Sequence, residues 1–175
     1  MKLLVSVASK HGATAEIAEE LGRALDAALR ERGIGNGDEV VDVRPAEEVD
    51  SVDGYDAVVL GSAVYAGHWL KPARELAERH ARALSEKPVW LFSSGPVGDP
   101  PKPEEDPVDV AEILEATKAR EHRVFAGRLD RARLGFAEKA VMLALRAPEG
   151  DFRNWQSVGK WAVDVADTVR AEVPA

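Results

Sequence analysis

The chain has 175 residues, of which 45% are hydrophobic and 31% are charged, a composition typical of a globular protein with a substantial core. It contains no cysteine, which excludes disulfides, thiol catalysis and cysteine-bound zinc or iron–sulfur sites. No apolar stretch approaches the length of a membrane span, and the N-terminal apolar run is too short for a signal peptide. We therefore expect one cytoplasmic domain over residues 1–175.

The net charge of −8 is distributed unevenly along the chain. Residues 118–160 hold ten Lys and Arg against five Asp and Glu, so the remainder is strongly acidic. This asymmetry favours a docking face for a charged partner, and we expect no nucleic-acid partner. The alternative is that these charges are scattered over a solvated surface.

The first motif is a strand that turns directly into a helix. Residues 3–8 form a short apolar run with branched side chains, typical of a buried strand. Residues 17–29 place Ile17 and three leucines four residues apart among charged residues, which predicts an amphipathic helix packed on a sheet. The free N–H groups and the dipole at the start of such a helix make the turn between them, residues 9–14, a candidate anion site.

This turn consists of Ser9, Lys10, His11, Gly12, Ala13 and Thr14. It has neither the G-x-G-x-x-G of a dinucleotide fold, nor the G-x-x-x-x-G-K-[ST] of a P-loop, nor the acidic cluster of a receiver domain. It resembles the flavodoxin phosphate loop, [ST]-x-[ST]-G-x-[ST], except that His11 stands where that pattern has a hydroxyl. Ser9 and Thr14 would offer hydroxyls to a phosphate, and Gly12 would let the backbone approach it. The alternative interpretation is an ordinary helix N-cap at Thr14.

The rest of the chain alternates apolar runs with amphipathic segments. Strands are predicted at residues 39–44, 55–61, 89–93 and 124–127. Helices are predicted at residues 46–52, 71–84, 108–121 and 154–171, and the last of these should bury Trp155, Val158, Ala162, Val165 and Val169. Strands that alternate with helices imply a parallel sheet covered on both faces. We therefore predict a flavodoxin-like three-layer α/β sandwich with five strands in the order 2-1-3-4-5.

Two segments exceed the minimal form of that fold. Residues 96–107 hold five prolines and four acids and should form an extended, exposed loop. Residues 128–153 form an insert between the fifth strand and the last helix. On a helix, Phe136, Ala140 and Leu143 share one face, which we expect to cover the sheet edge. The other apolar residues, Val141, Met142 and Leu145, would then point elsewhere, flanked by cations. Such a group suits contact with anionic lipid or with the carboxylates of a porphyrin. The alternative is that all apolar residues of the insert are buried against the core.

The candidate binding site lies where the loops after three strands should meet. Ligands of open parallel sheets bind beyond the carboxyl ends of the strands, at the point where the strand order reverses. A flavin ring is held there by stacking on aromatic side chains and by backbone groups, to which glycine permits close approach. We expect Tyr65 and Trp69 to stack on the ring, with packing of Trp69 on the sheet as the alternative. The candidates in the second and third loops are Ser62, Ala63, Val64, Tyr65, Gly67, Trp69, Ser94, Gly95 and Asp99.

Three histidines besides His11 are assigned by their positions. His68, in the second loop, is interpreted as a cap or surface residue, with proton donation near a flavin as the alternative. His80 recurs with two leucines at helical spacing and should pack on its helix, and His122 should lie on the surface. No catalytic residue and no metal site is predicted.

Within the flavodoxin family, the chain most closely resembles the menaquinone-dependent protoporphyrinogen dehydrogenases. The likeness lies in residues 61–64 (Gly-Ser-Ala-Val), in Gly67 with His68, in residues 126–129, in the insert, and in Asn154 with Trp155. This resemblance implies FMN as cofactor and electron transfer from a porphyrinogen to a respiratory quinone. The insert is shorter, less basic and less aromatic than expected of those enzymes, which leaves the substrate open.

Three other functions remain as alternatives. The chain could be a soluble flavodoxin electron carrier, a flavin-dependent NAD(P)H:quinone reductase or, because of His11, a fold that has lost its cofactor. The redox partner is accordingly expected to be a quinone, a porphyrinogen or an electron-transfer protein. The acidic total favours a carrier that docks on basic partners, whereas the basic insert at residues 128–153 favours an anionic substrate or peripheral contact with the inner face of a membrane.

Overall fold

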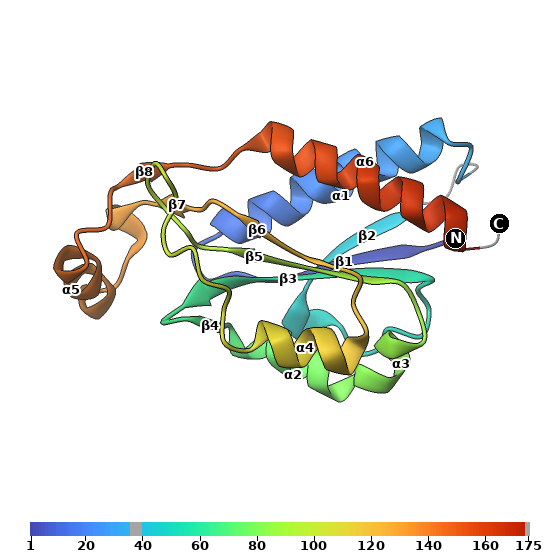
Figure 1. The fold of residues 1–175 in the computed structure, drawn as a ribbon, viewed down its shortest axis with the longest axis horizontal. Coiled ribbons are helices and arrows are strands. Elements are labelled where there is room, and N and C mark those ends of the chain that lie inside the picture. Colours follow the sequence, from blue (N-terminus) through green and yellow to red (C-terminus); the bar gives the residue numbers. More distant parts are fainter. Residues whose placement is uncertain (36–39, 174–175) are drawn as a thin grey trace.

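A parallel sheet forms the centre of the protein in a computed structural model that describes residues 1–35 and 40–173 (Figure 1). The five parallel strands lie in the order β2-β1-β3-β5-β6, which confirms the predicted flavodoxin-like order. A short strand that was not predicted, β4, pairs antiparallel with the end of β3. The strands are β1 (Leu3–Ala8), β2 (Val41–Pro45), β3 (Ala57–Tyr65), β4 (His68–Trp69), β5 (Val89–Ser94) and β6 (His122–Phe125).

Helices cover both faces of this sheet, which makes the three layers that the alternating pattern predicts. One face carries α1 (Ala13–Glu31) and α6 (Trp155–Glu172), which pack side by side. The other face carries four shorter elements: the 3₁₀ turn η1 (Ala46–Glu48), α2 (Lys71–Arg79), α3 (Ala81–Ser85) and α4 (Val110–Thr117).

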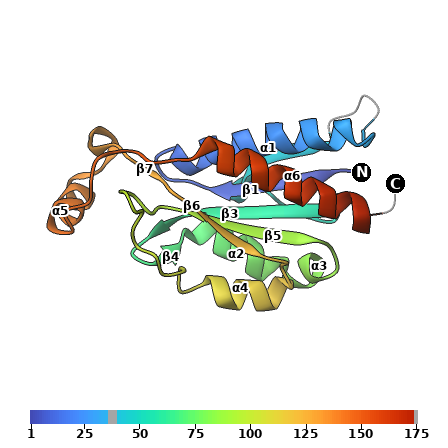
Figure 2. The same ribbon diagram turned by 45° about the horizontal axis from the view of Figure 1, so that its top comes forward.

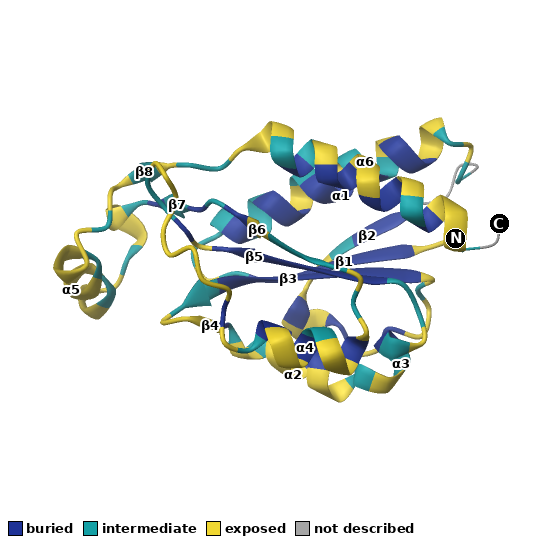
Figure 3. Ribbon diagram, viewed as in Figure 1, coloured by how far each residue is buried: buried dark blue, intermediate teal, exposed yellow. Residues whose placement is uncertain are grey.

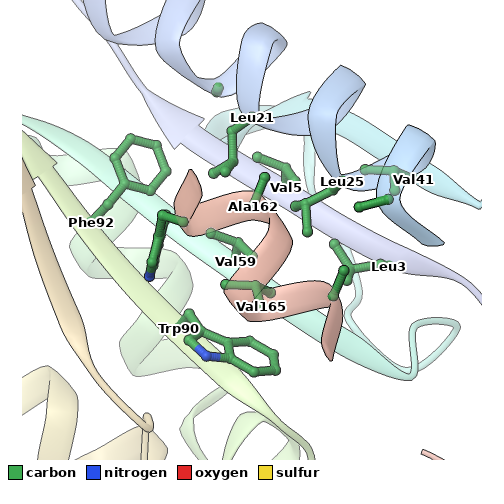
Figure 4. Packing of buried hydrophobic residues seen from close by; sticks show 14 of the residues in the cluster. Leu3, Val5, Leu21, Leu25, Val41, Val59, Trp90, Phe92, Ala162 and Val165 are labelled. Atoms are coloured by element: carbon green, nitrogen blue, oxygen red, sulfur yellow. The ribbon is translucent and has the colours of Figure 1, made fainter. Parts of the chain in front are cut away.

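Alternating side chains of the central strands supply the two hydrophobic cores. In β1, Leu3 and Val5 pack under α1 and α6, whereas Leu4 packs on the opposite face, as the period of two in a strand requires. Figure 4 shows Leu21 and Leu25 of α1 meeting the first of these faces beside residues of α6. All six residues of β1 are buried, because a central parallel strand is covered on both faces.

Several predicted boundaries shift in the structure. The predicted strand at residues 39–44 is observed as β2, and its first residue, Glu39, lies outside the described residues. The predicted helix at residues 71–84 divides at His80 into α2 and α3. The helix predicted at residues 108–121 ends at Thr117, because Lys118 adopts a left-handed conformation with φ 52° that turns the chain toward β6.

The final helix buries a different tryptophan from the one predicted. Trp155, its first residue, is 40% exposed, since it lies beyond the packed face and contacts the guanidinium of Arg153. Trp161, which the sequence did not single out, is buried between Phe92 and Phe125. The positions predicted at Val158, Ala162, Val165 and Val169 are all buried.

The insert projects from the carboxyl ends of the strands, where α5 stands apart from the layered body (Figures 1 and 2). It comprises the hairpin strands β7 (Arg128–Leu129) and β8 (Gly150–Asp151), the 3₁₀ turn η2 (Arg131–Arg133) and α5 (Phe136–Ala144). None of the nine residues of α5, all of which the structure describes, is buried (Figure 3). Phe136 is 93% exposed, so the prediction that its face covers the sheet edge is wrong.

Candidate functional site

A cavity of about 390 Å³ lies at the carboxyl ends of β1, β3 and β5. Its first wall is the turn between β1 and α1, its second is the end of β3, and its third is the loop after β5. The insert closes a fourth side with residues of β7, η2 and α5. The three loops that the sequence analysis expected to meet therefore do meet, together with the insert.

The turn of residues 9–14 has the geometry of an anion site. Gly12 is the N-cap of α1 with φ 85°, a left-handed conformation that glycine adopts without a steric penalty. The helix begins at Ala13, so Thr14 lies inside its first turn and the alternative that Thr14 is the N-cap is wrong. The first N–H groups of a helix have no partner within it, and the helix dipole favours an anion there.

The hydroxyl of Ser9 shows how this turn could accommodate a flavin phosphate. Its Oγ is buried, and no hydrogen-bond partner for it exists among the described residues. A buried hydroxyl without a partner is costly, and a phosphate oxygen on the turn would satisfy it. Ser9 and Thr14 both line the cavity, so the residues present fit the phosphate of a flavin nucleotide.

Tyr65 lies in the second wall, at the end of β3. Burial, followed by the charge of Glu138, raises the pKa of its phenol to about 12. The phenol is therefore neutral at physiological pH, and the ring is a half-buried aromatic surface of the kind that stacks on a flat apolar ligand. Lys10 Nζ lies 5.2 Å from its centroid, and the His11 ring lies 6.1 Å from it.

The third wall brings two glycines into contact. A Cβ atom on Gly127 would lie 3.2 Å from Cα of Gly95, so the loops after β5 and β6 meet backbone to backbone. The Gly127 N–H also donates to the carbonyl of Pro96 at 2.6 Å. This packing holds Ser94 and Gly95 at the cavity, where backbone groups could meet the polar edge of a flavin ring.

Five predicted site residues do not line the cavity, although Gly12 shapes its turn. Trp69 is 1% exposed and donates its indole N–H to Ser93 Oγ at 2.7 Å, so its ring is a core element and the stacking prediction fails for it. Ser62 is buried beside it and accepts the N–H of Leu70 at 2.9 Å. The remaining two, Gly67 and Asp99, are exposed in loops away from the lining.

One histidine, His122, differs from its assignment. The side chain of His122 is only 5% exposed, with Nε2 2.7 Å from Ser93 Oγ and Nδ1 3.3 Å from Asp106, so the surface assignment is wrong. Burial lowers the pKa of His122. His68 Nδ1 lies 3.2 Å from both carboxylate oxygens of Asp109, outside the cavity lining, and His80 is half-buried between α2 and α3.

Three arginines of the insert surround the turn, although the turn itself contains none. Arg133 donates to the carbonyl of His11 at 3.1 Å, and Arg128 donates to both carboxylate oxygens of Glu16 at 3.2 Å. Arg153 donates to Glu16 at 2.6 Å and to the carbonyl of Ala13 at 3.2 Å. The sequence analysis missed this cluster, for which the only signal was the basic surplus of residues 118–160.

One of the two predicted faces of α5 borders the cavity, although Val141 and Leu145 on it remain 51% and 69% exposed. Ala137, Val141, Met142 and Leu145 line the cavity, together with Leu134 just before the helix. The opposite face carries Phe136, Ala140 and Leu143, which are exposed to solvent. An apolar wall therefore borders the cavity beyond the turn of residues 9–14, and a second apolar face points away from the protein.

Within residues 1–35 and 40–173, no group of three His, Asp or Glu side chains is arranged to hold a metal ion. No helix in this part of the chain combines the length and hydropathy needed to cross a membrane.

Comparison with known proteins identifies the family of the chain. The family model described as a flavodoxin domain matches residues 4–155. The chain is 26% identical over 179 residues to the protoporphyrinogen IX dehydrogenase (quinone) of Escherichia coli strain K12, with 95% of each chain covered.

Solved structures show the same fold at lower identity. A flavodoxin from the domain Archaea superposes with a TM-score of 0.59 at 18% identity, covering 97% of this chain and 99% of its own. Oxidised Flavodoxin 2 from Bacillus cereus superposes with a TM-score of 0.57 at 19% identity, covering 98% of this chain and 99% of its own. Because the family model spans most of its length, the chain belongs to the flavodoxin-domain family.

Proposed function

We propose that the protein is an FMN-dependent oxidoreductase of the quinone-linked protoporphyrinogen dehydrogenase type. The observation that carries this proposal is the buried hydroxyl of Ser9, which has no partner among the described residues and lies on the turn at the start of α1. Ser9 lines the same cavity as Tyr65 and Gly95. This combination provides one place for a phosphate and another for a flat ring.

Each part of the cavity has a distinct task in this proposal. Ser9, Thr14 and the N–H groups at the start of α1 bind the terminal phosphate, and Tyr65 stacks on the ring. The backbone of Ser94 and Gly95 meets its polar edge. The bound FMN supplies the reversible uptake of electrons, since the chain has no cysteine for redox chemistry.

A terminal phosphate favours FMN over FAD. The turn is covered by Arg133 and Glu138 of the insert, and the sequence holds no second glycine-rich fingerprint for an adenosine half. The name of the Escherichia coli relative supports a porphyrinogen donor and a quinone acceptor. The apolar wall of Val141, Met142 and Leu145 supports an apolar reaction partner beside the flavin.

A soluble electron carrier is the second candidate. The structural neighbours cited above are flavodoxins that superpose over nearly their full length, and the net charge of −8 suits docking on a basic partner protein. A carrier exchanges electrons with another protein and needs no apolar substrate wall, so the two candidates differ in whether small molecules oxidise and reduce the flavin directly.

The decisive experiment is reconstitution followed by anaerobic mixing. Apoprotein is titrated calorimetrically with FMN and FAD. The FMN-loaded protein is then mixed separately with protoporphyrinogen, menaquinol or NAD(P)H, and the reduced protein is mixed with menaquinone, while the flavin spectrum is recorded. We expect tighter binding of FMN than of FAD, reduction by the porphyrinogen, and reoxidation by menaquinone. Reduction by NAD(P)H would instead identify an NAD(P)H:quinone reductase, and inertness toward all three would favour the carrier. No flavin binding would overturn the proposal.

We also propose that the exposed face of α5 contacts an anionic membrane surface. Phe136 is 93% exposed and Leu143 is 69% exposed on a helix that stands apart from the body. Arg131, Lys139 and Arg146 lie beside this face in the sequence and are exposed. Apolar side chains bordered by cations are typical of helices that lie in the interface of an anionic bilayer, where a lipid-borne quinone is found.

A further inference from the structure

One carboxylate of the insert reaches the two nitrogen-bearing side chains of the turn at residues 9–14. Glu138 Oε1 lies 2.6 Å from Lys10 Nζ and 3.1 Å from His11 Nε2. Its other oxygen accepts the N–H of Gly135 at 2.8 Å, which fixes the carboxylate at the start of α5. Lys10, His11 and Glu138 all line the cavity that the flavin phosphate would enter.

This carboxylate has the charge and the partners of a phosphate oxygen. The hydrogen bond from Lys10, followed by those from Gly135 and His11, lowers the pKa of Glu138 to about 2. Glu138 is therefore an anion throughout the physiological range. A phosphate on the same turn would be drawn to the same donors and repelled by the carboxylate, because like charges at close range oppose each other.

Glu138 also attaches α5 itself to this turn. Among the described residues, it is the only side chain of α5 that hydrogen-bonds to another element. No residue of α5, which is described in full, is buried, so little apolar packing holds the helix when this contact opens. Residue 11, where flavodoxins have a hydroxyl, is a histidine in this chain and supplies one of the two bonds.

We propose that Glu138 is an internal anion that competes with the flavin phosphate for Lys10 and His11, so that loading of the cofactor weakens the docking of α5. The inference rests on the proposed function, since it takes the flavin phosphate to bind the turn. The two effects are linked. The factor by which bound FMN weakens the docking of α5 equals the factor by which undocking of α5 strengthens FMN binding. The insert and the cofactor site are thus coupled through one carboxylate.

The test compares FMN with riboflavin, which has the same ring and ribityl chain but no phosphate. Dissociation constants are measured for the wild-type apoprotein, for Glu138→Gln, and for the control Glu112→Gln, which removes an equal charge from the exposed side of α4. We expect Glu138→Gln to bind FMN roughly tenfold more tightly, a typical coupling, and to leave riboflavin binding unchanged. The control should change neither constant.

Three outcomes would overturn the inference. They are weaker FMN binding in Glu138→Gln, an unchanged FMN constant, and an equal change for both flavins, which would mean that Glu138 shapes the cavity without opposing the phosphate. Thermal unfolding of both variants confirms that they are folded.

Hydrogen exchange of α5 tests the second half of the inference without a flavin. In the wild type, the amides of residues 136–144 should exchange faster in inorganic phosphate than in chloride of equal ionic strength. In Glu138→Gln they should exchange fast in both. Equal exchange in the two wild-type samples would overturn the inference. If the wild type binds neither flavin, the proposed function fails, and this measurement alone decides whether Glu138 competes with phosphate.

Discussion

The cofactor assignment depends most on one residue, Ser9. Its Oγ is buried without a partner among the described residues, in a turn where the backbone of Gly12 is left-handed. A buried hydroxyl that has no hydrogen-bond partner until a ligand binds destabilises the free protein and increases the affinity for that ligand. Removing the hydroxyl should therefore raise the stability of the free protein and lower its affinity for the ligand, so one substitution separates the two effects.

Ser9→Ala should therefore stabilise the apoprotein and weaken its complex. Removing the unsatisfied hydroxyl is expected to raise the free energy of unfolding by about 1 kcal/mol. Losing one hydrogen bond to a charged phosphate, about 1.5–3 kcal/mol, should raise the FMN dissociation constant by roughly one to two orders of magnitude. Denaturant unfolding and calorimetric titration measure the two effects, and Ser157→Ala on α6, which does not line the cavity, is a serine control. A Ser9→Ala, Thr14→Ala variant that binds FMN normally would show that the phosphate lies elsewhere.

At the scale of elements, the β7–β8 hairpin is tied to the start of α1 by Arg153. Its side chain is 4% exposed and donates to Asp151 at 2.7 Å as well as to Glu16 and Ala13. The hydrogen bond from Arg153 is the largest cause of the lowered pKa of both Glu16 and Asp151. A lowered carboxyl pKa contributes stability at neutral pH that is lost as the pH falls through the lowered value.

Arg153→Met should remove this contribution and its pH dependence. We expect a loss of about 1–3 kcal/mol in the free energy of unfolding at pH 7, since the guanidinium is buried but the carboxylates are partly screened by solvent. The difference from the wild type should hold down to about pH 5 and shrink as the pH falls further, because both carboxyls then become protonated. Urea unfolding at several pH values measures it. Arg170→Met on α6, which is exposed, is the control, and a difference that grows toward acid would contradict this account.

The helix α5 permits a second test at this scale, directed at its outer face. Phe136→Gln with Leu143→Gln should reduce cosedimentation with anionic vesicles, because both side chains are exposed and would enter the interface. A separate Arg131→Glu, Lys139→Glu, Arg146→Glu variant should lose binding too, and wild-type binding should weaken with salt as the Debye length falls below about 10 Å. Val163→Gln, an exposed position on α6, is the control. Equal sedimentation of all variants would leave α5 without a membrane role.

At the scale of the whole molecule, one ligand would connect elements that are distant in the sequence. The cavity is lined by the ends of β1, β3 and β5 and by the insert, so a bound flavin adds contacts among all of them. A ligand that binds only the folded state stabilises it by an amount set by its concentration relative to its dissociation constant.

FMN at one hundred times its dissociation constant should raise the free energy of unfolding by about 2.7 kcal/mol. For a chain of this length, that corresponds to an increase in Tm of about 5–10 °C, which differential scanning calorimetry can record. The Ser9→Ala, Thr14→Ala variant at the same FMN concentration should show a smaller increase. An equal increase in the two proteins would mean that the flavin is held without the turn.

Local patterns determined most of the fold. The apolar runs of β1, β3 and β5 are buried in the structure, because a strand covered on both faces needs apolar side chains along its whole length. The spacing of four in α1 marked its buried face correctly, and the turn before it forms the predicted helix start at the cavity. These features depend on neighbours within a few residues, which the sequence displays directly.

Only the tertiary structure decided which side chains the site uses. Tyr65 and Trp69 are close in the sequence, yet the ring of Trp69 enters the core and that of Tyr65 borders the cavity, because the β3–β4 hairpin reverses the chain between them. The periodicity of α5 identified its two faces but not their directions, which depend on the bond from Glu138 to a turn more than one hundred residues earlier. Composition and periodicity carry no information about such contacts, since they arise only when distant segments pack together.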